Sequence, residues 1–252
     1  MTPRKAPHKS PSTTSEAKVI TVINRKGGVG KSTITVNLAA TTAKVLSANG
    51  TGAETDPVAA ISIDPQGSAI WWADRVDDLP FHIVDAHDDL PGLRRLKNLN
   101  GITRVYVDTP GWIEIDRGER PLGAGPAAEA LEAALAVTDL AIVPVLPEAL
   151  GFGPTMQTIE RVLKPRGIPF LVVLNNWDPR DGVLDRDETL KFIDNNGWPR
   201  ATTVVRRYKL HAKAAAEGQV VTEYAKSRTA LEARLDFSEL AHEVDIAIAG
   251  GR

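Results

Sequence analysis

Residues 19–33 read Val19-Ile-Thr-Val-Ile-Asn-Arg-Lys-Gly-Gly-Val-Gly-Lys-Ser-Thr33, and they carry the strongest structural signal in the sequence. Its first five residues are typical of a buried strand, whereas the residues from Ser32 onward follow a helical pattern. A glycine-rich turn between a strand and a helix leaves backbone N–H groups free to point at an anion, and the helix dipole strengthens that field. We therefore expect a phosphate-binding loop, with Lys31 on the β- and γ-phosphates of a nucleotide and the Ser32 hydroxyl on Mg²⁺.

The loop departs from the common phosphate-loop pattern at its start. Arg25 stands where a glycine is usual, and Lys26 follows it. A second lysine inside a phosphate loop costs electrostatic energy unless something anionic faces it. The nucleotide of a second subunit is one such anion.

Short β-branched runs alternate with longer amphipathic stretches along the rest of the chain. The predicted strands are residues 19–23, 59–63, 81–84, 104–107, 140–145, 170–174 and 202–205, and the predicted helices are residues 32–47, 127–137, 154–163, 185–195 and 227–248. Strands that are apolar on both faces and separated by helices indicate a doubly wound, mostly parallel α/β sheet with helices on both faces.

The domain organisation follows from the same pattern. We expect one domain over residues 18–252, preceded by a disordered basic tail at residues 1–17. Residues 49–57 and 111–125 have turn chemistry without a period and are predicted to be loop insertions.

The composition excludes several kinds of site. The 252 residues contain no cysteine, which rules out disulfides, thiolate zinc sites and cysteine-ligated iron–sulfur clusters. No apolar run approaches the ~18–20 residues that cross a bilayer, and the N-terminus lacks the apolar core of a secretory signal, so we expect a cytoplasmic protein. The formal net charge is −2, and any nucleic-acid surface must therefore be local.

Two further motifs follow predicted strands, namely Ile63-Asp-Pro-Gln-Gly-Ser68 and Val105-Tyr-Val-Asp-Thr-Pro-Gly111. Together with Lys26-Gly-Gly-Val-Gly-Lys-Ser-Thr33, and in the same order, they resemble three motifs of the ParA/MinD ATPases. These are the deviant phosphate loop, the first switch, and the Walker B strand with the second switch. The resemblance covers residues 18–245, nearly the whole chain.

The resemblance implies a role for each matching position. ATP would be held by Lys26, Gly27, Gly28, Val29, Gly30, Lys31, Ser32 and Thr33. Lys26 would be the signature lysine that reaches the partner subunit's ATP across a sandwich dimer. Catalysis would rest on this residue together with Lys31 and Asp64.

Asp64 and Asp108 would complete the site, with Asp64 orienting the attacking water and Asp108 supporting Mg²⁺ through water. Both follow predicted strands, at the edge of an open α/β sheet where ligands bind. Ser32, Asp64 and Asp108 are therefore the expected metal residues. One departure is Ser62, since the family usually has Asp-x-Asp where this chain has Ser62-Ile-Asp64.

The base of the nucleotide has an expected contact outside the three motifs. Asn175, at the end of the predicted strand 170–174, occupies the place where the family contacts adenine. An amide can donate to and accept from a base edge. Asn176 is adjacent, and a loop-capping role for either asparagine stays open.

The C-terminal part of the chain carries a local positive charge. Between Arg200 and Arg228, seven Lys or Arg stand against two acidic residues, a balance of +5. The order of residues again resembles ParA-type partition ATPases, and Arg207 and Arg228 match positions that this family uses for nonspecific DNA. A solvated charged face explains the other basic residues equally well.

Two features that certain ParA/MinD relatives need are missing from the sequence, namely cysteines and a basic amphipathic helix at the C-terminus. Iron-carrying relatives need cysteines, and a MinD-like membrane protein would end in a basic amphipathic helix, whereas residues 235–245 are acidic. No membrane partner is therefore expected. With about 17 residues before the first predicted strand, an N-terminal helix-turn-helix domain is not expected either.

The resemblance implies a small ParA-type ATPase that partitions a plasmid or chromosome. ATP and Mg²⁺ would drive a homodimer that coats nucleoid DNA without sequence preference, and a ParB-type centromere-binding partner would trigger hydrolysis. Two alternatives stay open. One is an ATPase of the same kind that positions a protein cargo, and the other is a metabolic ATP-dependent ligase, which needs neither Lys26 in trans nor a DNA surface.

Overall fold

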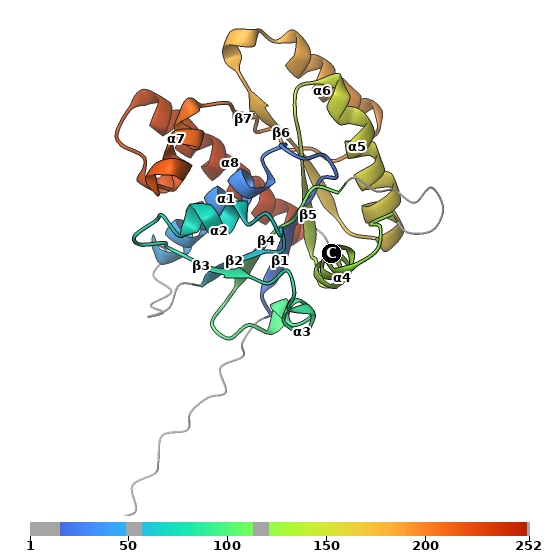
Figure 1. Ribbon diagram of the computed structural model, residues 1–252. Helices are drawn as coiled ribbons and strands as arrows, with labels where there is room; N and C mark the ends of the chain where they lie inside the picture. The colour runs from blue at the N-terminus through green and yellow to red at the C-terminus, as the bar shows by residue number, and fades with distance from the viewer. Residues whose placement is uncertain (1–15, 49–56, 113–120, 251–252) are drawn as a thin grey trace, which may run out of the picture.

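The computed structural model describes residues 16–48, 57–112 and 121–250 (Figure 1). The predicted tail at residues 1–17 and the predicted insertions at residues 49–57 and 111–125 therefore lie largely outside the described residues. Within these ranges the chain forms one seven-stranded parallel sheet with helices on both faces, which confirms the predicted fold.

The sheet has the strand order β3-β2-β4-β1-β5-β6-β7, and each neighbouring pair is parallel. The strands are β1 (Lys18–Val22), β2 (Val58–Ser62), β3 (His82–Asp85), β4 (Arg104–Asp108), β5 (Leu140–Val145), β6 (Phe170–Trp177) and β7 (Val205–Arg206). The central strands β2 and β5 are buried along their whole length, as a sheet covered on both faces requires. Because all strands run the same way, the carboxyl ends of β2, β4, β1 and β5 meet at one edge.

Two hydrophobic cores lie on the two faces of the sheet. One core contains residues of α1 (Lys31–Ala48), α2 (Ser68–Ala73), α7 (Lys209–Glu217) and α8 (Arg228–Gly250). The other contains residues of α3 (Leu90–Leu93), α4 (Pro126–Leu135) and α6 (Leu184–Asn195), with α5 (Phe152–Gln157) packed beside it. Short turns of helix complete the chain: η1 (Leu96–Asn98), η2 (Ala149–Gly151), η3 (Thr158–Leu163), η4 (Lys164–Arg166), η5 (Pro179–Asp181) and η6 (Val221–Glu223).

The helix predicted at residues 154–163 is not uniform. It begins as α5 and continues as η3, which is π-helical. Thr155 and Thr158 donate their hydroxyls to the carbonyls four residues back, at 2.8 and 2.9 Å. Threonine bonds of this kind bend helices, and π-helical turns occur often at functional sites.

The strand predicted at residues 202–205 is shorter than expected and shifted, because β7 covers only Val205 and Arg206. The backbone N–H groups of Thr202 and Thr203 donate instead to the Glu243 carboxylate of α8, at 2.7 and 2.8 Å. These two N–H groups are therefore not available to donate to a neighbouring strand of the sheet.

The connection between α7 and α8 is fastened to two other helices. The Val221 N–H donates to the Asn37 side chain of α1 at 2.8 Å, and the Trp72 indole of α2 donates to the Gln219 carbonyl at 2.9 Å. A Cβ at Gly218 would lie only 1.7 Å from the Arg75 carbonyl oxygen, so a glycine is needed there. Residues 218–221 thus touch both the helix of the phosphate loop and the helix that follows Asp64.

Candidate nucleotide-binding site

The phosphate loop joins β1 to α1, as predicted. Gly28 and Gly30 have φ values of 73° and 87°, in the left-handed region that favours glycine. A Cβ at Gly30 would lie 2.3 Å from the Asn175 side-chain nitrogen, so this glycine is also required by close packing. The glycine spacing seen in the sequence therefore reflects both backbone geometry and space.

Three polar residues that were not predicted hold the base of the loop. Asn24 is buried, and its amide donates to the Pro144 carbonyl at 2.8 Å and to the Thr155 hydroxyl at 2.9 Å. Its carbonyl oxygen accepts the Lys26 N–H at 2.9 Å, and the Thr158 hydroxyl accepts the Arg25 N–H at 3.0 Å. The loop is thereby fixed to α5 and η3 across the top of the sheet.

Lys31 is the first residue of α1 and lies almost wholly buried inside the loop, 7% exposed. Its ammonium donates to the Lys26 carbonyl at 3.2 Å. Burial lowers the pKa of Lys31, and the negative charges of Asp108 and Asp64 partly oppose that shift. A cation held at this point can neutralise phosphate oxygens that the loop N–H groups surround.

Asp108 ends β4 and is completely buried beside Ser32. The Ser32 hydroxyl donates to its Oδ2 at 2.7 Å, whereas its Oδ1 has no hydrogen-bond partner. Burial raises the pKa of Asp108 to about 7, and the nearby charge of Asp64 adds to the rise, while Ser32 and Lys31 oppose it. An orphaned buried carboxylate oxygen is costly unless something else binds it.

These residues fit a magnesium ion. Mg²⁺ takes one or two carboxylates together with waters and phosphate oxygens rather than a cage of protein ligands. In the described part of the chain, no three His, Asp, Glu or Cys side chains converge. The hydroxyl of Ser32 and the unpartnered oxygen of Asp108 are the groups that would face the ion.

Asp64 follows β2, next to the end of β4. Its carboxylate accepts the Gln66 N–H at 3.0 Å and its carbonyl accepts the Gly67 N–H at 2.8 Å, so a tight turn sets its direction. Ser62, which replaces a usual aspartate, lies in register with Asp108 on the neighbouring strand. An aspartate there would bury a second carboxylate beside Asp108.

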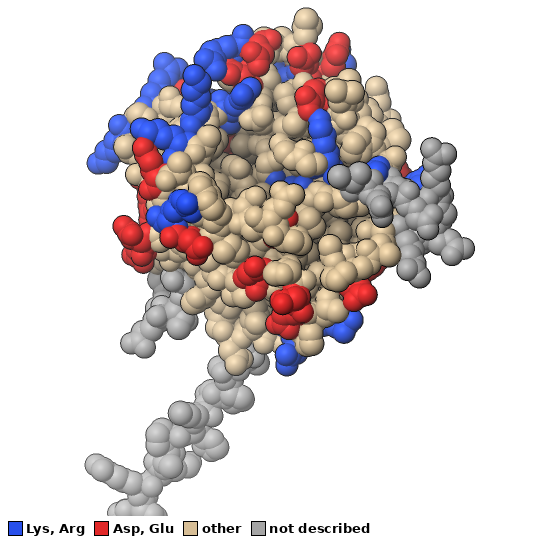
Figure 2. All heavy atoms as spheres, viewed as in Figure 1, with Lys and Arg blue, Asp and Glu red and all other residues tan. Residues whose placement is uncertain are grey.

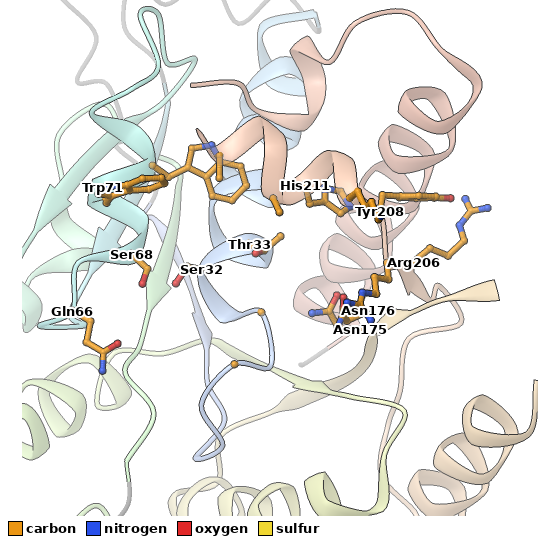
Figure 3. A pocket seen from close by; sticks show the side chains of 17 residues that line it. Ser32, Thr33, Gln66, Ser68, Trp71, Asn175, Asn176, Arg206, Tyr208 and His211 are labelled. Carbon is orange, nitrogen blue, oxygen red and sulfur yellow. The ribbon is translucent and has the colours of Figure 1, made fainter. Parts of the chain in front are cut away.

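A cavity of about 670 Å³ opens between the phosphate loop, α2, the end of β6 and α7 (Figure 3). This volume lies within the range of small-molecule pockets. Ser32 and Thr33 face it from α1, Trp71 from α2, and His211 from α7. Burial lowers the pKa of His211 to about 4, so its imidazole is neutral near pH 7.

Both asparagines considered for the base contact line this cavity. Asn175 is buried, and its amide donates to the Val29 carbonyl at 2.7 Å, so it braces the phosphate loop. Asn176 is exposed and has a φ of 63°. The adenine contact of Asn175 stays a prediction.

Lys26 forms an ion pair with Glu148 of its own chain. Its side chain is 23% exposed, and the carboxylate lies on the loop that follows β5. The ammonium therefore already has an anionic partner in cis. The predicted contact with a second subunit's nucleotide stays a prediction.

The structure separates the basic residues of the C-terminal region into two kinds. Arg206 pairs with the buried Asp236 at 2.6 Å, and Arg200 pairs with Asp194 at 2.7 Å, so both have structural roles. Arg207 is exposed at the cavity, and Arg228 at the start of α8 is 93% exposed and pairs with Glu232 at 3.0 Å. Lys and Arg side chains gather on the surface around α7 (Figure 2).

None of the helices in the described ranges combines the length and the apolar character that crossing a bilayer requires.

Comparisons with known proteins agree with a nucleotide site. The model of a family described as the CobQ/CobB/MinD/ParA nucleotide binding domain matches residues 20–221. A maintenance of carboxysome distribution protein A from Gloeobacter kilaueensis is 32% identical over 230 residues, covering 90% of this chain and 94% of that protein. One from Halothiobacillus neapolitanus is 28% identical over 240 residues, covering 91% and 97%.

The fold is shared with a solved relative. The septum site-determining protein MinD from Pyrococcus horikoshii, complexed with Mg-ADP, has a TM-score of 0.64 and 20% identity, covering 94% of this chain and 99% of that chain. The predicted cofactors, ATP and Mg²⁺, agree with that adenine nucleotide and metal. From the match over residues 20–221, this chain belongs to the CobQ/CobB/MinD/ParA family of nucleotide-binding proteins, which confirms the resemblance drawn from its three motifs.

Proposed function

We propose that this protein is a ParA-type ATPase that uses a cycle of ATP binding and hydrolysis to position a protein cargo. The observation that carries this proposal is the similarity to two proteins named for maintaining carboxysome distribution, along at least 90% of this chain. Of the interpretations that the sequence leaves open, cargo positioning therefore has more support than partition of DNA by a ParB-type partner. The cargo is proposed to be a large protein assembly, with an adaptor protein in the place of the ParB-type partner.

The site supports ATP hydrolysis. The glycine loop and Lys31 would bind the phosphates, while Ser32 and Asp108 would hold Mg²⁺, which would supply positive charge to the phosphate oxygens. Asp64, at the edge of the same site, orients the attacking water. Its carboxylate is half-buried and its direction is set by the turn at Gln66, which suits a positioning task.

The proposed cycle alternates between a monomer and a homodimer. In the monomer Lys26 pairs with Glu148. In the dimer it contacts the nucleotide of the second subunit, where the phosphate charge replaces the carboxylate. Two copies of the basic surface at Arg207 and Arg228 then lie on one DNA duplex, which raises the apparent affinity without new contacts.

DNA binding provides the first test, because a metabolic ligase would not need it. The protein should bind random duplexes only with ATP, and log K should fall with log salt with a slope of about −4 to −7 if each subunit neutralises roughly 2–4 phosphates. Arg207→Ala and Arg228→Ala should weaken binding equally for all sequences and flatten that slope. Lys164→Ala, which removes an exposed lysine paired with Glu160, is the control. It should change neither the affinity for DNA nor the slope of its salt dependence. Equal binding without nucleotide would contradict the proposed cycle.

Deletion of the gene for this protein in its source organism distinguishes a protein cargo from a DNA cargo. If the protein positions a protein assembly, its loss should cluster or misplace that assembly in the cell while plasmid inheritance continues. Fluorescent tagging of the assembly and counting of plasmid-free cells measure the two outcomes. Plasmid loss with normally spaced assemblies would favour DNA partition instead.

A further inference from the structure

The sheet edge that carries the phosphate loop has an exposed apolar side chain on one side of the loop and a cavity with largely apolar walls on the other. The strand order β2-β4-β1-β5 determines this arrangement, since the loop follows β1. The segments after β2 and β4 therefore lie on one side of it, and the segment after β5 lies on the other (Figure 1).

The apolar side chain is Leu150, in η2 after β5. It is 84% exposed, more than any other large hydrophobic residue in the described ranges. It lies beside Lys26, because Glu148 pairs with that lysine and a Cβ at Gly151 would lie 3.9 Å from its Nζ. A leucine left in water next to a functional lysine forgoes the free energy that its burial would contribute.

The cavity has a volume of about 240 Å³ and lies between the two switch segments. Pro65 lines it after β2, Pro110 and Trp112 line it after β4, and Leu131 of α4 lies among its remaining walls. A Cβ at Gly111 would lie 3.1 Å from the Gly27 nitrogen, so the second switch touches the phosphate loop. We name this space the switch cavity.

We propose that Leu150 of each subunit inserts into the switch cavity of the other subunit in the ATP-bound dimer. The inference rests on the proposed function, because it needs the dimer in which Lys26 faces a second nucleotide. A two-fold interface is self-complementary, so a group on one side of the axis meets whatever lies on the other side. With the axis near Lys26, the second copy brings its Leu150 to the side where the switch cavity opens.

The second copy is the favoured occupant for two reasons. Any copy that seats a phosphate site over Lys26 also covers Leu150, which lies beside that lysine. Most residues that line the switch cavity are apolar, and its two polar members, Asp64 and Gln66, both belong to the first switch, so a leucine would pack against the apolar walls. Once inserted, the side chain would lie between Pro65 and Pro110 and fix the spacing of the two switches, including Asp64.

Dimerisation of a variant with a shortened side chain at position 150 tests the proposal. With a non-hydrolysable ATP analogue, Leu150→Ala should weaken the dimer about 100-fold or more by sedimentation, because two leucines lose their burial. Its affinity for nucleotide as a monomer should stay unchanged. The matched control is Leu184→Ala, at the N-terminus of α6, which removes another highly exposed leucine (75%) and should dimerise normally.

The absence of cysteine allows a direct test of the contact. Leu150→Cys combined with Ala127→Cys, which lines the switch cavity, should form a disulfide-linked dimer under mild oxidation only when the analogue is present. Leu184→Cys combined with Ala127→Cys should not. A weaker dimer without this cross-link would place Leu150 elsewhere in the interface and overturn the proposal.

The outcomes also distinguish the inference from the function on which it rests. If the unaltered protein fails to dimerise with the analogue, the proposed cycle is wrong and the inference falls with it. If the unaltered protein dimerises but Leu150→Ala dimerises equally well, only the contact between Leu150 and the switch cavity is wrong.

Discussion

Replacement of Asp108 by asparagine should stabilise the nucleotide-free protein at alkaline pH. The carboxyl is completely buried, and burial raises its pKa from 3.8 to about 7. The folded protein therefore keeps a proton that the unfolded chain releases between these pH values, and the stability of the unaltered protein falls as pH rises through this window. Asparagine carries no charge at any of these pH values and can still accept the Ser32 hydroxyl.

The magnitude follows from the size of the shift. At about 1.4 kcal/mol per pKa unit, this rise in pKa lowers the free energy of unfolding of the unaltered protein by about 4 kcal/mol at pH 8. Below pH 4 it lowers that free energy very little. For a chain of this length, 1 kcal/mol changes the melting temperature by about 2–4 °C, so Asp108→Asn should melt about 8–16 °C higher at pH 8. Nucleotide and Mg²⁺ should stabilise only the unaltered protein strongly, because the ion then replaces the proton at the carboxylate.

Thermal unfolding at pH 5, 6.5 and 8, without nucleotide, measures this effect. Asp77→Asn removes an exposed carboxylate and is the control, which should keep the pH dependence of the unaltered protein. If Asp108→Asn and the unaltered protein lose stability in parallel between pH 5 and 8, the carboxyl is ionised throughout and the reasoning fails.

Three further substitutions test the site. Lys31→Ala should abolish ATP binding, because it removes the buried cation inside the loop, and a fluorescent nucleotide titration would show tight binding if this is wrong. Asp64→Ala should bind ATP normally yet stop its hydrolysis, since orientation of water acts in the transition state alone; surviving phosphate release would make Asp64 a switch residue only. Lys26→Ala should bind ATP but stay monomeric in sedimentation with the analogue, and a normal dimer would remove its role in trans.

Much of the fold could be predicted because its strands are short, β-branched and buried on both faces. Six of the seven predicted strands agree with the structure to within a few residues, and the glycine spacing located the phosphate loop. The helices α2 and α7 were not predicted, since α2 has only six residues and α7 has nine, of which only Ala214 is buried. Such elements are defined by what they pack against rather than by a period in the sequence.

The site was predictable to the extent that its residues belong to local motifs. Ser32 lies within hydrogen-bond distance of Asp108, because strand ends in a parallel sheet share one edge, and the roles of both residues stay predictions. The supports of the loop were missed, since Asn24 reaches Thr155 across 131 positions of the chain. The signal for this contact in the sequence was an asparagine placed directly after the predicted strand at residues 19–23.

The fastening of residues 218–221 makes the connection between α7 and α8 a poor hinge. The contact of Gly218 with the Arg75 carbonyl leaves no slack, and the bonds at Gln219 and Val221 join the connection to α2 and α1. A displacement of α2 therefore cannot be absorbed in a soft loop and must carry the start of α8 with it or break these bonds. We therefore expect the segment after Asp64 and the surface at Arg228 to move together as one rigid unit.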